Sequence, residues 1–246
     1  LERRKLSKYI GEKISGKVIK TKNNYGVCAL VPTPSMQRYL SMLNPGMNLL
    51  DIGCGYGTAC TLPALKENIQ VHAIDIDPNH LALLHNICKE KGYKATVIEG
   101  RFPEIDLETN YFDAIVAHSS LQYLNIDELK RALLKIKTLL RKDGTFFIMV
   151  TTPYMKIFSN FLPVYLDNKE KNIFPAGRIE DSRHFIKNPL FEIPQTLTLF
   201  DKEELLTLLT QAHFRILECE YSSMNEFSSY LQDGEKGGVV YAICSL

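Results

Sequence analysis

The sequence predicts one α/β domain built on a doubly wound, mostly parallel sheet. Two observations carry this prediction. Between residues 34 and 150, apolar segments of strand length alternate with amphipathic segments of helix length. One of these strands runs directly into a glycine-rich turn and a helix, a local geometry that brings backbone groups up to a ligand. With 246 residues, of which 45% are hydrophobic, the chain can bury the core that such a domain needs.

Composition and charge limit the partners and the surroundings of the protein. The net charge of +1 gives no overall attraction to nucleic acid or to an acidic membrane. The six cysteines include no Cys-x-x-Cys pair and mostly lie in apolar segments, so we expect free thiols, a reducing environment and a cytoplasmic protein. No apolar run approaches the length of a membrane span, and the basic start lacks the apolar core of a signal peptide.

Residues 1–33 are predicted to form a basic N-terminal arm or cap. The first 22 residues contain eight Lys or Arg and two Glu, a net charge of +6, so the rest of the chain carries −5. Leu6, Ile10 and Ile14 recur every four residues and predict one helical stripe that packs on the domain. Contact of this arm with RNA or with an acidic membrane surface is the alternative.

The glycine-rich turn is the most informative stretch of the chain. An apolar strand carries Asp51 near its end, and Gly53, Gly55 and Gly57 follow at alternate positions. A helix is predicted to begin at Thr58, and the free N–H groups at its start would favour a carboxylate or a phosphate. The dinucleotide fingerprint needs G-x-G-x-x-G/A, and Thr58 stands at its sixth position. A nicotinamide-dependent oxidoreductase is therefore the least favoured function.

Three segments resemble the class I S-adenosylmethionine-dependent methyltransferases. The pattern from Asp51 to Gly57 matches their motif I, D/E-x-G-x-G-x-G, while residues 111–124 resemble their fourth strand and residues 139–145 the sequence before their fifth. The resemblance covers residues 34–150 well and the C-terminal strands loosely. It implies a Rossmann-like, seven-stranded sheet with helices on both faces and a final antiparallel hairpin. It also implies S-adenosyl-L-methionine as cofactor and S-adenosyl-L-homocysteine as product.

The resemblance assigns cofactor-binding roles to the first strand and to the loop after it. It implies that the methionine moiety lies on the loop, against Gly53, Cys54, Gly55 and Gly57. It implies further that Asp51 helps to orient the amino group of that moiety. No metal is expected, because no cysteine–histidine cluster suggests one.

The second strand, residues 70–75, ends in a carboxylate. Asp75 stands about 20 residues beyond the glycines, where an acid can accept hydrogen bonds from both ribose hydroxyls. Ile76 follows it and is included in the predicted cofactor site. Asp77 directly precedes Pro78 and a long helical pattern, so it is predicted to be the N-cap of that helix.

The adenine contact is where the sequence departs from the family. A third strand is followed by Arg101 and Phe102, where the family usually has an acid that binds the adenine amino group. Backbone groups of Arg101 and Phe102 remain able to contact the ring edge, and Phe102 remains able to stack on the ring. Glu104 or Asp106 is an alternative acid, although both are expected to face water.

The fourth strand is predicted to bring His118 and Ser119 close to the reacting methyl group. This follows from the position where the strand order reverses, which is where open α/β sheets place their ligands. His118 is either a general base, since its ordinary pKa lies near neutrality, or a hydrogen-bonded residue that only shapes the site. Asp113, at the start of the same strand, is expected to fix local structure.

The chain after the fifth strand departs from strand–helix alternation. Residues 34–150 are assigned to the cofactor-binding core, residues 151–200 to a lid inserted between strands five and six, and residues 201–246 to a C-terminal helix and hairpin. Asp201 is predicted to cap that last helix. Within the insertion, Thr152 is predicted to cap a helix that Pro163 ends. The polar connection between the last two strands is expected either to flank the substrate or to be a mobile loop.

The predicted function is methyl transfer from S-adenosylmethionine to an oxygen, nitrogen or sulfur atom, most simply of a small molecule. One alternative is an RNA or protein methyltransferase that uses the basic arm. Another is a protein that binds S-adenosylmethionine or a nucleotide without catalysis, which the departure at Arg101 allows. The sequence does not specify the oligomeric state.

Overall fold

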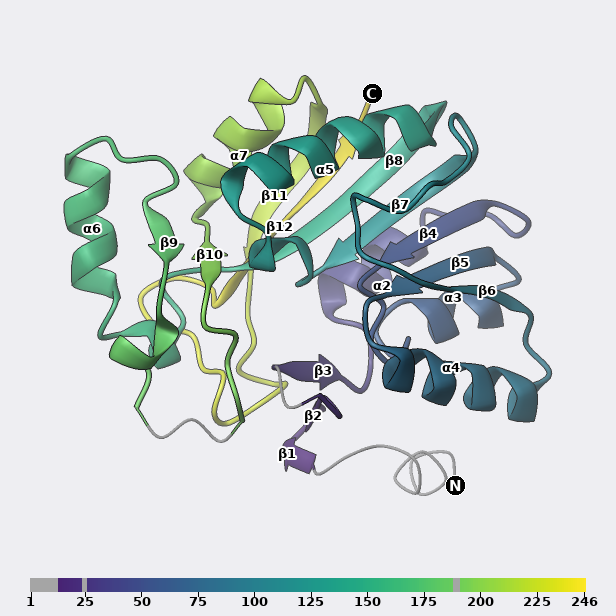
Figure 1. Ribbon diagram of the computed structural model, residues 1–246, viewed down its shortest axis with the longest axis horizontal. Helices are drawn as coiled ribbons and strands as arrows, with labels where there is room; N and C mark the ends of the chain where they lie inside the picture. The colour runs from purple at the N-terminus through teal and green to yellow at the C-terminus, as the bar shows by residue number, and fades with distance from the viewer. Residues whose placement is uncertain (1–12, 24–25, 188–190) are drawn as a thin grey trace.

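The centre of the protein is a seven-stranded sheet with the strand order β11-β12-β8-β7-β4-β5-β6 (Figure 1). The computed structural model describes residues 13–23, 26–187 and 191–246. The strands of this sheet are β4 (Asn48–Ile52), β5 (Gln70–Asp75), β6 (Ala95–Glu99), β7 (Phe112–His118), β8 (Leu140–Thr151), β11 (Arg215–Ser222) and β12 (Val239–Ser245). The strands from β4 to β8 run parallel, and β12 is antiparallel to both β8 and β11. The predicted mostly parallel, seven-stranded sheet is confirmed.

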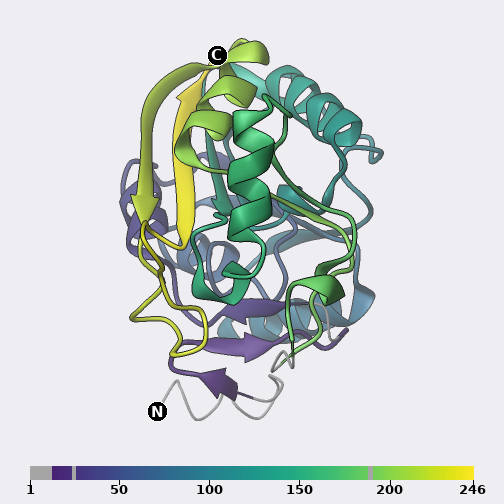
Figure 2. The same cartoon turned by 90° about the vertical axis from the view of Figure 1, so that its left-hand side faces the viewer.

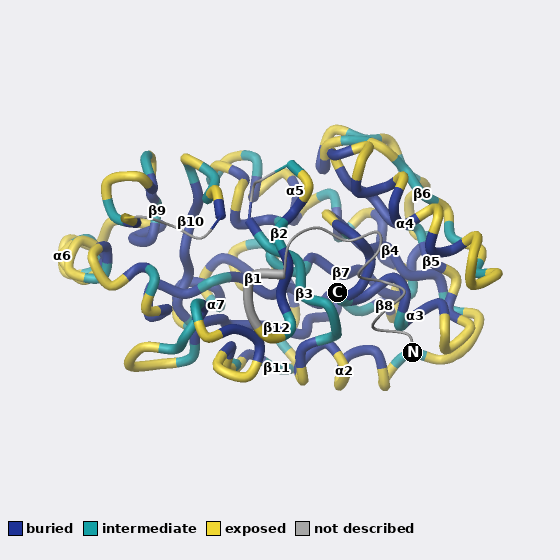
Figure 3. Tube along the Cα trace, turned by 90° about the horizontal axis from the view of Figure 1, so that it is seen from below, coloured by how far each residue is buried: buried dark blue, intermediate teal, exposed yellow. Residues whose placement is uncertain are grey.

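Helices cover both faces of the sheet, as a doubly wound fold requires. They are α2 (Pro34–Leu40), α3 (Thr61–Lys66), α4 (Pro78–Lys91), α5 (Ile126–Leu139) and α7 (Lys202–Gln211). Successive residues of β4 point to opposite faces: Leu49 packs with residues of α2, α3 and α4, and Leu50 packs with residues of α5 and α7. The sheet is buried between these layers, and exposed residues lie on the outer sides of the helices (Figure 3). Within the described ranges, no helix is both long and apolar enough to cross a membrane.

Local capping signals define where three of the helices begin. The Asp77 carboxylate accepts a hydrogen bond from the Asn79 N–H, which confirms the predicted N-cap of α4. Asp201 caps α7 in the same way, also as the sequence suggests. Asn125 and Glu128 form a reciprocal capping box at the start of α5. Each such cap stabilises its helix by about 1 kcal/mol.

The junction between α5 and β8 is shorter than the sequence suggests. The helix ends at Leu139, and the strand begins at Leu140 instead of near residue 145. The Arg141 guanidinium donates to the Asp113 carboxylate at 2.8 Å, and the same carboxylate accepts from the Asn48 N–H at 2.8 Å. Asp113 therefore ties three strands together at the edge opposite their carboxyl ends, in the structural role expected for it.

The N-terminal segment is a β-structure where it is described, so the predicted helical stripe is wrong for residues 13–22. A three-stranded antiparallel sheet is formed by β1 (Lys13–Ser15), β2 (Val18–Lys20) and β3 (Val27–Ala29). Gly16, at φ +51°, makes the turn from β1 to β2 in the left-handed region that glycine favours. Leu6 and Ile10 lie outside the described residues. We call residues 13–23 and 26–29 the N-terminal sheet.

Residues 152–200 form a segment between β8 and α7, which we call the insertion. It contains α6 (Leu162–Glu170), β9 (Gly177–Ile179) and β10 (Leu197–Leu199), and Figure 2 shows α6 standing in front of the main sheet. The helix predicted from Thr152 is absent, because residues 152–161 form turns and one short 3-10 helix at Lys156–Phe158. Pro163 lies in the first turn of α6 instead of ending a helix, a position where its missing N–H is tolerated. That the insertion acts as a lid remains a prediction.

Candidate cofactor and acceptor site

A cavity of about 560 Å³ lies at the carboxyl ends of the parallel strands. It includes the ends of β4 and β7, on either side of the point where the strand order reverses, and extends to β5 on one side and to β8 and β12 on the other. Three further segments complete its walls: the N-terminal sheet, the insertion, and the connection between β11 and β12. Ten of the predicted site residues line it. They are Asp51, Gly53, Cys54, Gly55, Asp75, Ile76, Arg101, Phe102, His118 and Ser119.

The glycines of the motif serve packing between segments. Gly53 has φ +71°, and a Cβ there would lie 2.4 Å from Cβ of Ser120, which follows β7. Gly57 also has a positive φ but is not among the residues that line the cavity. A Cβ on it would lie 2.7 Å from Leu84 of α4. These glycines allow the loop to approach β7 and α4 closely, at distances that no larger residue permits.

The N–H groups of the glycine loop are already used within the protein. Those of Gly53 and Cys54 both donate to the Ile74 carbonyl, at 2.8 and 2.9 Å, and that of Gly57 donates to Cys54. The N–H of Gly55 donates to the Asp75 carboxylate at 2.7 Å. In addition, α3 begins at Thr61 and is only six residues long. The N–H groups of Gly53, Cys54, Gly55 and Gly57 are therefore occupied, and the helix begins at Thr61 instead of Thr58. Anion binding by N–H groups at the start of the helix remains a prediction.

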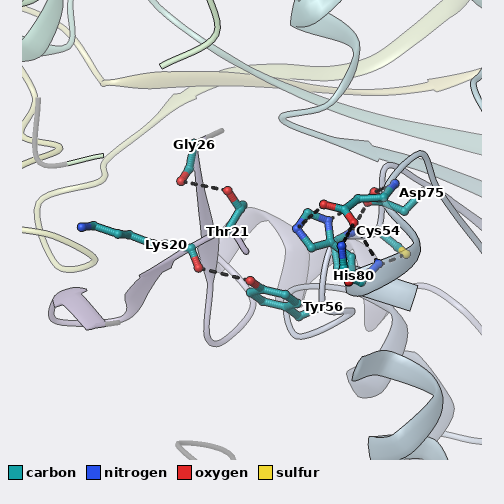
Figure 4. Close-up of polar contacts among 10 residues, drawn as sticks. Lys20, Thr21, Gly26, Cys54, Tyr56, Asp75 and His80 are labelled. Atoms are coloured by element: carbon teal, nitrogen blue, oxygen red, sulfur yellow. Dashed lines mark hydrogen bonds and ion pairs between the residues drawn. The ribbon is translucent and has the colours of Figure 1, made fainter. Parts of the chain in front are cut away.

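The N-terminal sheet is fastened directly to the glycine loop (Figure 4). The Tyr56 hydroxyl donates to the Lys20 carbonyl at 3.2 Å, and the Thr58 hydroxyl donates to the Ala29 carbonyl. The space that a Cβ on Gly55 would fill is taken by the Cys28 sulfur, 2.8 Å from that position. The sequence gives no sign of this contact, because it joins residues from two separate segments.

Asp75 is held rigidly at the end of β5. One carboxylate oxygen accepts from the Gly55 N–H at 2.7 Å, and the other accepts from the Asp77 N–H at 2.9 Å and lies 3.2 Å from His80 Nδ1. Burial would raise the pKa of Asp75, but the hydrogen bonds from His80 and from these two N–H groups outweigh it and hold the pKa below its ordinary value. An ionised carboxylate thus faces the cavity at neutral pH.

His80 is part of the cavity wall, a position that its sequence context did not predict. It is 4% exposed, lines the cavity, and places Nδ1 against Asp75 and Nε2 3.6 Å from the Asp77 carboxylate. Its ring also meets the Tyr56 ring edge-on, at 5.0 Å between centroids (Figure 4). The signal in the sequence is a histidine three residues after the N-cap aspartate, which places it within reach of both carboxylates.

Asp51 is the second carboxylate of the cavity wall. It is 2% exposed, and its Oδ2 accepts from the Thr61 hydroxyl at 2.6 Å. Burial raises the pKa of Asp51 to about 6, and the nearby Asp75 adds to that shift. It forms no ion pair with any described residue, so the cavity presents a buried carboxylate to which a ligand ammonium group would be complementary.

The residues predicted near adenine differ in exposure: Ile76 and Arg101 lie at the surface, and Phe102 is buried. Ile76 is 63% exposed beside the cavity, which is unusual for a large apolar side chain. The Arg101 guanidinium turns to Glu128 of α5 and forms an ion pair there. Phe102 is buried in the cluster shared with α5. Backbone at Arg101 and the exposed Ile76 are thus the groups of this region that a flat ring would meet, and adenine binding by them remains a prediction.

His118 lies at the end of β7, in the middle of the cavity and opposite Met149 of β8. Burial lowers the pKa of His118 to about 4, so the imidazole is neutral at physiological pH. Its Nε2 atom is buried without a hydrogen-bond partner among the described residues. Ser119 has φ +56°, an uncommon conformation for a serine, and its N–H donates to the Met149 carbonyl at 2.8 Å.

The other half of the cavity is apolar and comes from distant parts of the chain. Met155 and Ile193 belong to the insertion, and Met224 and Leu231 belong to the connection between β11 and β12. This connection is folded, because Asp233 Oδ1 accepts from the N–H groups of Met224 at 3.1 Å and Gly238 at 2.7 Å. Sequence reasoning left open whether it was a mobile loop or a cavity wall. The structure shows it as a wall.

The described residues hold no group of three or more His, Cys, Asp or Glu side chains that could bind a metal ion. All six cysteines are free thiols.

Comparisons with known proteins agree with this architecture. A family model described as a methyltransferase domain matches residues 49–144. A SAM-dependent methyltransferase from Methanosarcina mazei is 19% identical with a TM-score of 0.67, over 88% of this chain and 98% of that one. A SAM-dependent methyltransferase from Aquifex aeolicus is 16% identical with a TM-score of 0.55, over 85% and 88% of the two chains.

A third similar structure contains ligands. It is the 1,6-didemethyltoxoflavin-N1-methyltransferase of Burkholderia thailandensis with bound 1,6-didemethyltoxoflavin and S-adenosylhomocysteine. It is 18% identical with a TM-score of 0.58, over 86% of this chain and 78% of that one. No curated protein sequence matches significantly. The family match covers the strands that carry Asp51, Asp75 and His118, so residues 49–144 match a methyltransferase domain, and the chain has the fold of these S-adenosylmethionine-dependent methyltransferases.

Proposed function

We propose that this enzyme methylates an oxygen, nitrogen or sulfur atom of a small molecule, and that both the cofactor and the acceptor bind in the 560 Å³ cavity. The carrying observation is the cavity itself, which joins carboxylates at one end to an apolar wall at the other. Cavities of about 300–1,000 Å³ are typical of small-molecule sites. Because this one has to hold the cofactor as well, the acceptor must be small.

The residues at the β4 and β5 ends fit the cofactor. We assign Asp75 to the ribose hydroxyls, because its ionised carboxylate is fixed by three donors at the strand end. Asp51 would hold the amino group, since it is a buried carboxylate without a cationic partner among the described residues. Gly53, Cys54 and Gly55 would contribute backbone surface to the methionine moiety, and Ile76 would cover the adenine.

The chemistry needs positioning more than it needs acid–base catalysis. When bound, the cofactor supplies a sulfonium methyl group: an acceptor lone pair forms the new bond to carbon, the electrons of the carbon–sulfur bond stay on sulfur, and the acceptor loses a proton. His118, with a pKa of about 4, is too weakly basic to remove a proton from an alcohol at neutral pH. We assign it to positioning, between the cofactor end and the apolar wall. Holding the two reactants in line can supply much of the rate.

The basic arm gives little support to an RNA substrate. Lys17 lies over the Phe227 ring at 5.1 Å and 3.9 Å from the Glu226 carboxylate, so this lysine packs on the protein. Lys17 belongs to the N-terminal sheet, and other residues of that sheet line the cavity. Deleting residues 1–12, which leaves the N-terminal sheet in place, tests the remaining possibility. Loss of RNA binding in that deletion would favour RNA, and absence of RNA binding with or without the deletion would exclude it.

Calorimetric titration tests the cofactor assignment. We expect S-adenosylhomocysteine to bind the wild-type protein and NAD not to bind. Asp75→Ala should weaken S-adenosylhomocysteine binding about 100-fold, the effect of losing two hydrogen bonds to a charged group at about 1.5 kcal/mol each. Asp113→Ala, at the opposite edge of the sheet, is the control. Preference for NAD, or equal binding by both variants, would contradict the assignment.

A further inference from the structure

We infer that the methyl acceptor is an uncharged molecule with a predominantly apolar body, which lies against a wall formed by the insertion and the β11–β12 connection. This inference rests on the proposed function and names the class of its substrate. It is carried by the distribution of charge around the cavity.

The Asp, Glu, Lys, Arg and His side chains that line the cavity are confined to one part of the chain. Asp51, Asp75, His80, Arg101 and His118 all belong to residues 51–118. Among the described lining residues after His118, and among those of the N-terminal sheet, none is Asp, Glu, Lys, Arg or His. The cavity therefore has a charged end at β5 and β4 and an uncharged end at β8 and β12.

The register of the sheet places these two ends apart. Asp75 ends β5, two strands away from β7, while His118 of β7 is paired with Met149 of β8, and Thr151 of β8 with Val239 of β12. Neighbouring strands are about 4.8 Å apart. An acceptor over β8 and β12 thus lies several strands from the carboxylates that would hold the cofactor, with His118 between them.

The uncharged end is built from apolar side chains of separate segments. Met155, Ile157 and Phe158 come from the first turns of the insertion, Ile193 and Leu197 from the chain leading into β10, and Met224 from the β11–β12 connection. A carboxylate, phosphate or ammonium group buried there would lose its hydration without gaining a partner among the described residues. An apolar body loses water from both surfaces and is favoured.

The polar groups of this end complement a neutral molecule. Gln122 and Thr151 line it, and the Gln122 carbonyl oxygen accepts the Thr151 N–H at 2.8 Å, which fixes the amide there. Amides and hydroxyls orient a ligand through neutral hydrogen bonds. Since no strongly basic group adjoins His118 on this side, the nucleophile should be one that reacts as the neutral molecule, such as an amine nitrogen that is unprotonated at neutral pH.

A matched pair of fluorescent probes tests the inference. N-phenyl-1-naphthylamine is neutral and apolar, and 1-anilinonaphthalene-8-sulfonate has the same ring system with one sulfonate added. We expect the protein saturated with S-adenosylhomocysteine to bind the neutral probe at least tenfold more tightly than the anionic one. Equal or tighter binding of the sulfonate, or no saturable binding of the neutral probe, would overturn the inference.

Two variants locate the probe. Ile193→Lys and Ile157→Lys place a cation in the wall from two different segments, at partly buried positions. Each should weaken binding of the neutral probe at least tenfold and improve binding of the sulfonate, while Ile193→Leu and Ile157→Leu should change it less than threefold. Circular dichroism shows whether the lysine variants fold. Unchanged binding of the neutral probe by both folded lysine variants would overturn the proposed location.

Failure of this inference is distinguishable from failure of the proposed function. S-adenosylhomocysteine binding by the wild-type protein is measured first, by calorimetry and without any probe. If the cofactor product binds but the probes show no preference for the neutral compound, the acceptor class is wrong and the methyltransferase assignment stands. If the cofactor product does not bind, the proposed function itself is at fault.

Discussion

The two halves of the cavity are built in different ways. The half at β4 and β5 takes its key groups from one contiguous stretch, from Asp51 to Phe102, and fixes them with backbone hydrogen bonds and buried carboxylates. The half at β8 and β12 is assembled from segments that are far apart in sequence, and its surface is apolar. The groups proposed for the cofactor are thus close together in the sequence, whereas the surface proposed for the acceptor depends on how the insertion and the β11–β12 connection pack on the sheet.

The largest effect is expected at Gly53, where the loop after β4 packs against Ser120. Gly53→Ala adds strain at φ +71° and a contact of 2.4 Å with Ser120, so we expect a loss of about 3 kcal/mol in the free energy of unfolding. That corresponds to a fall of about 9 °C in melting temperature. Thermal unfolding measures it.

Gly46→Ala provides the matched control for this substitution. Gly46 has φ +88° and nothing within 4 Å of the position of its Cβ, so this variant should show the strain alone, about 1 kcal/mol. If the two alanine variants melt at the same temperature, the contact with Ser120 is not the reason why position 53 requires glycine. Ser120→Gly should in turn restore part of the stability of Gly53→Ala.

The next substitution, at Asp233, tests whether the half of the cavity at β8 and β12, proposed for the acceptor, can be disturbed without affecting the half at β4 and β5, proposed for the cofactor. Asp233→Ala leaves the N–H groups of Met224 and Gly238 without their acceptor, at a loss of about 2 kcal/mol in local stability. We expect binding of a neutral apolar probe to weaken about tenfold and S-adenosylhomocysteine binding to change less than twofold. Asp233→Asn retains the accepting oxygen and should behave as the wild type. A parallel loss of both ligands would show that the halves are not independent.

A third prediction concerns His80 in the cofactor half. His80→Leu removes the donor to Asp75, so we expect S-adenosylhomocysteine affinity to fall about tenfold, or about 1.4 kcal/mol. His80→Asn keeps an N–H donor near the position of Nδ1 and should retain most of the affinity. Calorimetry on both variants measures this. Equal losses would mean that only the shape of the imidazole matters, and no loss in either would remove His80 from the site.

The fourth prediction uses the different pKa values of the two carboxylates. Asp51 has a pKa of about 6, whereas the pKa of Asp75 lies below its ordinary value, so only Asp51 takes up a proton between pH 8 and pH 5. An amino group needs the ionised form, and S-adenosylhomocysteine should therefore bind about tenfold more weakly at pH 5 than at pH 8. Asp51→Asn should bind weakly, with little of this pH dependence. A wild-type affinity independent of pH would exclude Asp51 as the amino ligand.

Protonation of Asp51 affects folding and ligand binding in opposite directions. Because burial raises the pKa of Asp51 above its unfolded value, the folded protein without ligand binds the extra proton more readily. Its contribution to stability is full below the unfolded pKa and is lost as the pH rises through about 6. Melting curves of the free protein and binding curves should thus move in opposite directions over this range.

What could be predicted from the sequence follows the same division. The buried strands and the caps at Asp77 and Asp201 depend on residues close in sequence, and their patterns were sufficient. The N-terminal sheet was missed because the spacing of Ile14 within a basic stretch favoured a helix, while the pairing that decides its structure involves β2 and β3. Met224 and Leu231 line the cavity only because Asp233 folds their segment, which no local pattern indicates.

The smallest effect tests the fastening of the N-terminal sheet to the glycine loop. Tyr56→Phe removes the hydroxyl that donates to the Lys20 carbonyl, worth about 1 kcal/mol, and should weaken S-adenosylhomocysteine binding about fivefold because the roof of the cavity loosens. Tyr39→Phe is the matched control, since that hydroxyl donates to the Thr145 carbonyl at 3.0 Å and does not line the cavity. We expect it to lower stability by a similar amount and to leave the affinity unchanged. If both variants bind S-adenosylhomocysteine with the same affinity, the N-terminal sheet covers the cavity without contributing to cofactor binding. The half at β4 and β5 would then include the glycine loop but exclude the N-terminal sheet.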